Sequence, residues 1–245
     1  MIQLISFRRP AQETYKGRKI MTDPGVHQAV EKLIRGYLDP GASILEIGAG
    51  EGAFSLRMQN HGYKISALDI DADNFDAPGV DFRRVGPEER ISAVFDNRKF
   101  QAVVAVEVIE HFRSTWKFFQ EATDLLEAGG RLVLTTPNLC SVYSRMVFLK
   151  EGRFFHFQGE DSWKMGHINP VPFFVVEQIA QECGFRLIGR QGIGYMPVLD
   201  WAGFRLRNLF TALPRLVLYS MMNGPGPKEG NILLYSFEKR SSSSS

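Results

Sequence analysis

The sequence is short of several features that mark particular protein classes. Only two cysteines, Cys140 and Cys183, occur in 245 residues, so a disulfide framework is excluded and a reducing, cytoplasmic compartment is expected. Neither cysteine has a Cys-x-x-Cys partner and no Asp or Asn ligands cluster, so no metal site is predicted. No run of about 18 apolar residues occurs, which argues against a spanning helix. Residues 1–10 also lack the order of a signal peptide.

An excess of one charge is also absent. The 29 Lys and Arg residues oppose 27 Asp and Glu residues, a net charge of +2, so no general electrostatic attraction to nucleic acid is expected. Phenylalanine, in contrast, is abundant with 19 residues. Many of these aromatic side chains lie in two stretches, 139–166 and 193–229, that interrupt the pattern of the surrounding chain.

Short apolar runs alternate with helical patterns from residue 43 onward. Near-continuous apolar runs are typical of strands buried on both faces, and strand–helix alternation indicates a parallel sheet. The predicted strands are 43–47, 64–69, 80–84, 101–106, 130–135, 185–189 and 231–239, and the predicted helices are 25–38, 53–61, 116–126 and 172–183.

These elements predict one domain over residues 1–240. It begins with a helical cap (1–40) and carries the two aromatic stretches as insertions, 139–166 and 193–229. The serine tail 241–245 is of low complexity and is expected to be disordered.

Three glycines follow the first predicted strand, in the order Ile47-Gly48-Ala49-Gly50-Glu51-Gly52. Glycine lets the backbone turn tightly and approach a ligand, and the helix that follows presents free N–H groups. Asp69 ends the second predicted strand, where nucleotide-binding α/β proteins hold a ribose with a carboxylate. The sequence therefore predicts a nucleotide-type site at this end of the first strand.

Glu46 discriminates between two kinds of nucleotide ligand. Gly48, Gly50 and Ala53 satisfy a dinucleotide fingerprint, which leaves an NAD(P)-dependent oxidoreductase as an alternative. The carboxylate of Glu46 would repel a pyrophosphate but attract a cation. It favours S-adenosylmethionine, which carries an ammonium and a sulfonium group and no phosphate.

The glycine-rich turn and Asp69, together with residues 100–111, 126–138 and 183–185, resemble in order the motifs of class I S-adenosylmethionine-dependent methyltransferases. The resemblance implies an α/β fold: a Rossmann-like, seven-stranded, mostly parallel sheet with helices on both faces and the last strand antiparallel. It also implies S-adenosylmethionine as the cofactor and aromatic insertions that cover the substrate side. The chain is similar to subgroups that act in quinone biosynthesis and on surface glycans.

The resemblance implies a set of cofactor contacts at the ends of strands. Glu46 would favour the ammonium group, Asp69 the ribose hydroxyls and Glu107 the methyl-donor side, with adenine near Gly86. Whether Glu88 replaces an Asp that the family often has there is left open. The full set is Glu46, Gly48, Ala49, Gly50, Gly52, Asp69, Ile70, Gly86 and Glu107.

Two histidines are candidate catalytic bases. His111 follows the fourth predicted strand and His167 follows the first aromatic insertion, and an imidazole is suited to remove a hydroxyl proton. Each could instead order a loop. Glu110 is interpreted as a helix-cap residue and His156 as a packing residue.

The expected acceptor is a small or lipid-linked molecule that is methylated on oxygen. An Asn/Asp-Pro-Pro-aromatic motif, typical of enzymes that methylate base amino groups, is absent, so a nucleic-acid substrate is not predicted. The basic amphipathic stretch 206–213 could contact a membrane surface or pack on the sheet or on a second subunit. A non-catalytic nucleotide-binding protein is a further alternative.

Overall fold

The structure, a computed structural model, describes residues 12–86, 89–194, 220–221 and 226–241. The first described element is a hairpin of β1 (Thr14–Tyr15) and β2 (Arg18–Lys19). Lys16 and Gly17 at its tip have φ angles of 47° and 87°, as a tight type I′ turn requires. The described part of the helical cap expected over residues 1–40 therefore contains a short hairpin before its helix.

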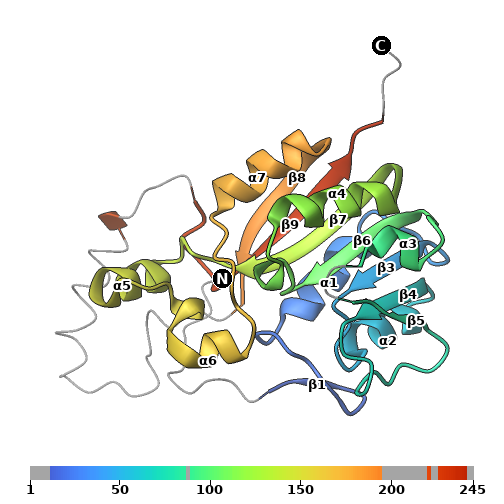
Figure 1. The fold of residues 1–245 in the computed structure, drawn as a ribbon, viewed down its shortest axis with the longest axis horizontal. Helices are drawn as coiled ribbons and strands as arrows, with labels where there is room; N and C mark the ends of the chain where they lie inside the picture. The colour runs from blue at the N-terminus through green and yellow to red at the C-terminus, as the bar shows by residue number, and fades with distance from the viewer. Residues whose placement is uncertain (1–11, 87–88, 195–219, 222–225, 242–245) are drawn as a thin grey trace.

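A seven-stranded sheet forms the centre of the molecule, in the order β5-β4-β3-β6-β7-β9-β8 (Figure 1). β3 to β7 are parallel, and β9 runs antiparallel to both neighbours. The predicted fold class and the antiparallel last strand are confirmed. The bounds are β3 (Ser43–Ile47), β4 (Lys64–Asp69), β5 (Asp81–Arg84), β6 (Phe100–Val106), β7 (Leu126–Pro137), β8 (Phe185–Ile193) and β9 (Ile232–Lys239).

Helices cover both faces of this sheet because the strands are apolar on both sides. α1 (Val26–Arg35) and α2 (Ala53–Asn60) share one buried cluster with Ile44, while the neighbouring Leu45 points into the cluster on the other face. That second face packs against α3 (Ile91–Val94), α4 (Thr115–Leu125) and α7 (Phe173–Glu182).

Several of the abundant phenylalanines lie in the hydrophobic cluster that packs against α3, α4 and α7. Phe119 makes edge contacts with Phe118, Phe185 and Phe237, at ring-centroid distances of 5.5, 5.9 and 5.8 Å. All four rings are buried. These phenylalanines therefore serve the core, not the substrate side.

The first predicted insertion folds into α5 (Val142–Glu151), a 3-10 turn η2 (Phe155–Phe157) and α6 (Gly159–Lys164). These elements follow the end of β7 and lie beyond that edge of the sheet (Figure 1). Most of the second predicted insertion, including the stretch 206–213, lies outside the described residues. Among the residues described, no helix has the length and apolar character needed to cross a bilayer.

β7 starts at Leu126, before the predicted start at residue 130. Leu126 already pairs with Phe100, ahead of a register irregularity between Phe100 and Ala102. Regular pairing resumes at Arg131 with Ala102, and Gly129, with a φ of 74°, lies in the interruption between these two pairs.

Candidate active site

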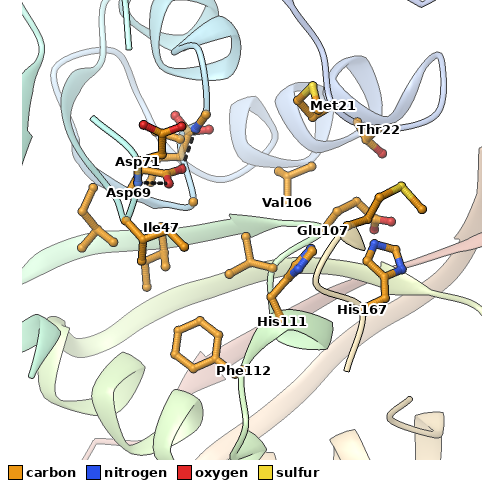
Figure 2. Close-up of a pocket in the computed structure, with 18 of the residues that line it drawn as sticks. Met21, Thr22, Ile47, Asp69, Asp71, Val106, Glu107, His111, Phe112 and His167 are labelled. Carbon is orange, nitrogen blue, oxygen red and sulfur yellow. Dashed lines mark hydrogen bonds between the residues drawn. The ribbon is translucent and has the colours of Figure 1, made fainter. Parts of the chain in front are cut away.

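A cavity of about 1110 Å³ opens where β3, β4 and β6 end. It is lined by the glycine-rich turn after β3, by the ends of β4 and β6, by the 3-10 turn η1 (Ile109–His111) and by residues around His167. Figure 2 shows Asp69 and Asp71 at one end and Glu107, His111 and His167 at the other. Of the predicted site residues, all but Gly52 line it.

The three glycines of the turn serve different purposes. Gly48, Gly50 and Gly52 have positive φ angles of 76°, 51° and 83°. A Cβ at Gly48 would lie 2.4 Å from Val108 Cγ2, and one at Gly52 would lie 2.9 Å from Ala77 Cβ. A Cβ at Gly50 would meet nothing within 4 Å. Gly48 and Gly52 therefore allow neighbouring side chains to pack closely against the turn. Gly50 faces open space.

Asp69 holds the turn in place through its carboxylate. Gly50 N–H donates to Oδ2 at 2.8 Å, and Asp71 N–H donates to Oδ1 at 3.0 Å. Each carboxylate oxygen keeps a second lone pair for a further donor. The group can therefore support the glycine-rich turn and still accept hydrogen bonds from a ligand in the cavity.

Glu46 is a buried carboxyl group at the end of β3. The Ser55 hydroxyl donates to Oε2. Burial, with a smaller contribution from the nearby Asp69, raises the pKa of Glu46 to about 8. No cation faces this group among the contacts described, so the site favours a ligand that brings its own positive charge.

Glu107, directly after β6, has a φ of 56°, which is unusual for a residue with a side chain. Such a conformation costs about 1–2 kcal/mol. Glu107 N–H donates to Thr135 Oγ1 at 2.9 Å, and that hydroxyl donates to Glu107 Oε1 at 2.9 Å. Burial, followed by the nearby Glu110 carboxyl, raises the Glu107 pKa well above its usual range. Strained backbone held by such bonds is typical of functional positions.

Gly86 and Ile70 lie on the side of the cavity next to β4 and β5. Gly86 N–H donates to Glu89 Oε2 at 2.9 Å. Glu88, the possible replacement for the Asp that the family often has, lies outside the described residues. Glu89 lines the cavity together with Gly86.

His111 and His167 come together although they are far apart in the sequence. Their ring centroids lie 4.9 Å apart in an edge-to-face arrangement. The contact is held by the backbone, since Ile168 N–H and Asn169 N–H donate to the Glu110 carbonyl at 3.1 and 3.0 Å. Burial lowers the pKa of both histidines, and each imidazole is therefore neutral near pH 7.

Glu110 does not cap a helix, contrary to the interpretation from its sequence. It is fully buried behind the histidines, and Thr136 Oγ1 donates to its Oε2 at 3.2 Å. Burial raises its pKa to about 8. His156, interpreted as a packing residue, lines the cavity. Its backbone carbonyl accepts a hydrogen bond from His167 Nδ1 at 3.0 Å.

Some cavity residues carry no local signal in the sequence. Met21, Thr22 and Asp23, between β2 and α1, line the cavity, as does Phe112 after η1. Met21 and Thr22 lie across the cavity from Phe112 (Figure 2). The three residues between β2 and α1 reach the cavity because their segment passes over the ends of the strands. No sequence motif marks such a passage.

The charge of the cavity supports a cationic ligand. Eight of its lining residues are Asp or Glu, against three that are Lys or Arg. Glu46 and Glu107 are largely protonated near pH 7 because of their raised pKa values, but the remaining acidic residues still outnumber the basic ones. Such a cavity repels a pyrophosphate and attracts an ammonium or sulfonium group. The NAD(P)-dependent alternative is therefore not favoured.

Comparison with known proteins agrees with this geometry. A family model described as a methyltransferase domain matches residues 22–189. A ubiquinone biosynthesis O-methyltransferase of Xanthomonas campestris is 29% identical over 108 residues, 40% of this chain and 44% of that protein. A ribosomal protein L11 methyltransferase of Nitratiruptor is 31% identical over 123 residues, 46% of this chain and 40% of that protein. The chain thus spans less than half the length of these relatives.

Solved structures share the fold. A SAM-dependent methyltransferase of Archaeoglobus fulgidus has a TM-score of 0.58 and 15% identity, covering 87% of this chain and 94% of that one. A phosphoethanolamine N-methyltransferase 2 of Haemonchus contortus, in complex with S-adenosyl-L-methionine, has a TM-score of 0.55 and 16% identity, covering 91% of this chain and 54% of that one. With the family match, the chain belongs to the class I S-adenosylmethionine-dependent methyltransferases, enzymes whose cofactor is S-adenosyl-L-methionine.

Proposed function

We propose that the chain transfers the methyl group of S-adenosylmethionine to a hydroxyl oxygen of a small-molecule acceptor, free or lipid-linked. The observation that carries the proposal is the pair of neutral imidazoles, His111 and His167, in the same cavity as the predicted cofactor residues. Removal of a hydroxyl proton by such a group contributes roughly 10²–10⁴ in rate.

The cofactor is assigned to the Asp69 end of the cavity and the acceptor to the histidine end. Glu46 would bind the ammonium group, Asp69 the two ribose hydroxyls, and the surroundings of Gly86 the adenine. Glu107 would lie beside the methyl group. Ala49 and Ile70 would line the cofactor as apolar neighbours, and Gly52 would support the turn from outside the cavity.

The reaction requires alignment above all. As the acceptor oxygen forms its bond to the methyl carbon, the carbon–sulfur bond breaks and its electron pair stays on sulfur, which yields S-adenosylhomocysteine. Holding oxygen, carbon and sulfur in line can supply as much as about 7–11 kcal/mol. The hydroxyl proton has to leave, and His111 and His167 are the groups placed to act on it.

One observation supports oxygen as the accepting atom, and a second supports an acceptor with an apolar part. The curated relatives matched over about two fifths of the chain include proteins named ubiquinone biosynthesis O-methyltransferase. The acceptor end also has apolar walls, with Phe112, Met165 and Ile168 among its lining residues. We further infer that residues 1–240 form one catalytic domain, because the end of the first insertion supplies Met165 to the cavity and the segment after it supplies His167.

The test uses S-adenosylmethionine with a labelled methyl group and matched acceptors that carry either a hydroxyl or an amino group, alongside protein and lipid extracts. We expect the label in methyl ethers. His111→Ala combined with His167→Ala should lower turnover by about 10²–10⁴ and leave the Kd of S-adenosylhomocysteine unchanged. His61→Ala, an imidazole that does not line the cavity, is the control. Label found only on nitrogen, or full turnover in the double variant, would overturn the proposal.

A further inference from the structure

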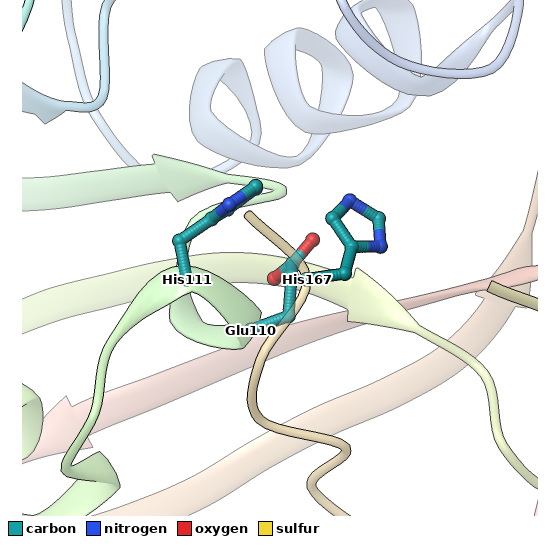
Figure 3. A group of neighbouring side chains, drawn as sticks. All are labelled: Glu110, His111 and His167. Atoms are coloured by element: carbon teal, nitrogen blue, oxygen red, sulfur yellow. The ribbon is translucent and has the colours of Figure 1, made fainter. Parts of the chain in front are cut away.

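Glu110, His111 and His167 form a cluster that no sequence motif announces. One carboxylate oxygen and one nitrogen from each ring lie within 4.8 Å of one another. Figure 3 shows the Glu110 carboxylate between the two rings. Two imidazoles and one carboxylate are a recognised ligand set for divalent transition-metal ions, with further coordination positions left open.

The Glu110 carboxylate has an unused oxygen in this cluster. Its side chain is fully buried, and Thr136 donates only to Oε2. Oε1 has no hydrogen-bond partner among the described residues. A buried carboxylate oxygen without a partner is costly, and a cation bound to it would offset that cost.

The His167 ring is oriented as a ligand. Its Nδ1 lies 3.0 Å from the His156 carbonyl oxygen. Because a carbonyl oxygen can only accept, Nδ1 carries the proton and Nε2 presents its lone pair. A carbonyl partner on the far nitrogen is typical of metal-binding histidines, since it fixes both the tautomer and the ring orientation.

We propose that Glu110, His111 and His167 bind one divalent cation of the Mn²⁺–Zn²⁺ series at the acceptor end of the cavity. Imidazole ligands favour such ions over Mg²⁺ and Ca²⁺, which prefer oxygen. Ligands 2.0–2.1 Å from a tetrahedral ion lie about 3.4 Å apart, so the cluster has to contract on binding. The His111 side chain, exposed at the cavity wall, would exchange its hydrogen bonds to the Gly166 and Glu107 backbone for the ion in that movement.

A catalytic role for this ion rests on the proposed function. The two histidines line the cavity, whereas Glu110 does not, so an acceptor would meet the ion on the histidine side. A divalent cation lowers the pKa of an oxygen bound to it. The acceptor proton would then pass to water. His111 and His167 would contribute as ligands of the ion. The oxygen–carbon bond would form as the carbon–sulfur bond breaks, with the electron pair left on sulfur.

The binding test uses the full chain after treatment with a chelator. Zn²⁺ is titrated by calorimetry and free Mn²⁺ is followed by electron paramagnetic resonance. We expect one ion per chain. His111→Ala, His167→Ala and Glu110→Gln should each weaken binding by at least about tenfold, and the control His61→Ala should not. The Kd of S-adenosylhomocysteine, measured on each variant, reports whether the fold and cofactor site are intact.

Different outcomes distinguish failure of the cation site from failure of the proposed function. Binding of neither ion, or equal binding by all variants, overturns the cation site. Methylation of a hydroxyl at an undiminished rate by ion-free protein overturns its catalytic role and leaves the proposed function standing. One ion bound through the three residues, with the methyl group delivered only to nitrogen, supports the site and overturns the proposed function.

Discussion

Replacement of Glu46 by Gln tests whether a buried carboxyl group has to ionise before the cofactor binds. Burial, more than the nearby Asp69, raises the pKa of Glu46 to about 8. Glutamine has nearly the same shape and can still accept from the Ser55 hydroxyl, but it never carries a charge. The variant therefore removes one titration with little change in packing.

The magnitude follows from the pKa of about 8. At pH 7 roughly one molecule in eleven is ionised, and ionising the rest costs about 1.4 kcal/mol. If the ammonium group of S-adenosylmethionine binds the carboxylate, binding at pH 7 releases about 0.9 proton. Between pH 6 and pH 7 the ionised fraction rises about ninefold. The Kd should fall about ninefold over that range.

The assay is calorimetry at pH 6, 6.5 and 7 in buffers of different ionisation enthalpy, which report the proton released. Glu46→Gln should bind with a Kd that does not change with pH, and Glu127→Gln, at an exposed carboxylate outside the cavity, should behave as wild type. A wild-type Kd equal at pH 6 and pH 7 would show that Glu46 does not ionise when the cofactor binds. The same slope in Glu46→Gln would assign the titration to another group.

The same pKa shift has a consequence for stability. A folded-state pKa of about 8, above the ordinary 4.5, means that protonated Glu46 favours the folded state. This contribution is complete below about pH 4.5 and is lost as the pH rises through about 8. Relative to wild type, Glu46→Gln should therefore be more stable at pH 9 than at pH 5, as measured by urea unfolding without cofactor.

Three further substitutions probe other parts of the structure. Asp69→Ala should weaken cofactor binding by about 1.5–3 kcal/mol, the range for hydrogen bonds to charged groups, with the exposed Asp73→Ala as control; an unchanged Kd would remove Asp69 from the site. Gly48→Ala places a Cβ 2.4 Å from Val108 Cγ2 at a φ of 76° and should cost about 1–3 kcal/mol in chemical denaturation. Adding Val108→Ala should recover part of that loss, and full additivity of the two changes would contradict the clash. Phe119→Ala removes a buried ring with three aromatic neighbours and should cost about 3–5 kcal/mol in unfolding free energy, whereas a loss below about 1 kcal/mol would contradict tight packing there.

The glycine-rich turn was predictable because its signals are local. Apolar residues before Gly48 predict a buried strand, and glycines that need positive φ predict a tight turn into a helix. Parallel strands bring their ends to one edge of the sheet, so Glu46, Asp69 and Glu107 could be placed in one site without a structure. The different tasks of Gly50, which faces open space, and Gly52, which packs on Ala77, depend on neighbours that are distant in the chain.

The order of the central strands and helices, the glycine-rich turn and the acidic residues at the strand ends follow from the sequence, because periodicity and turn chemistry act over a few residues. The meeting of His167 with His111, and the burial of Glu110 beside them, follow from long-range packing instead. That meeting depends on hydrogen bonds from Ile168 and Asn169 to the Glu110 carbonyl. Such backbone bonds are available to every residue type, and a local pattern therefore cannot specify which distant segments they join.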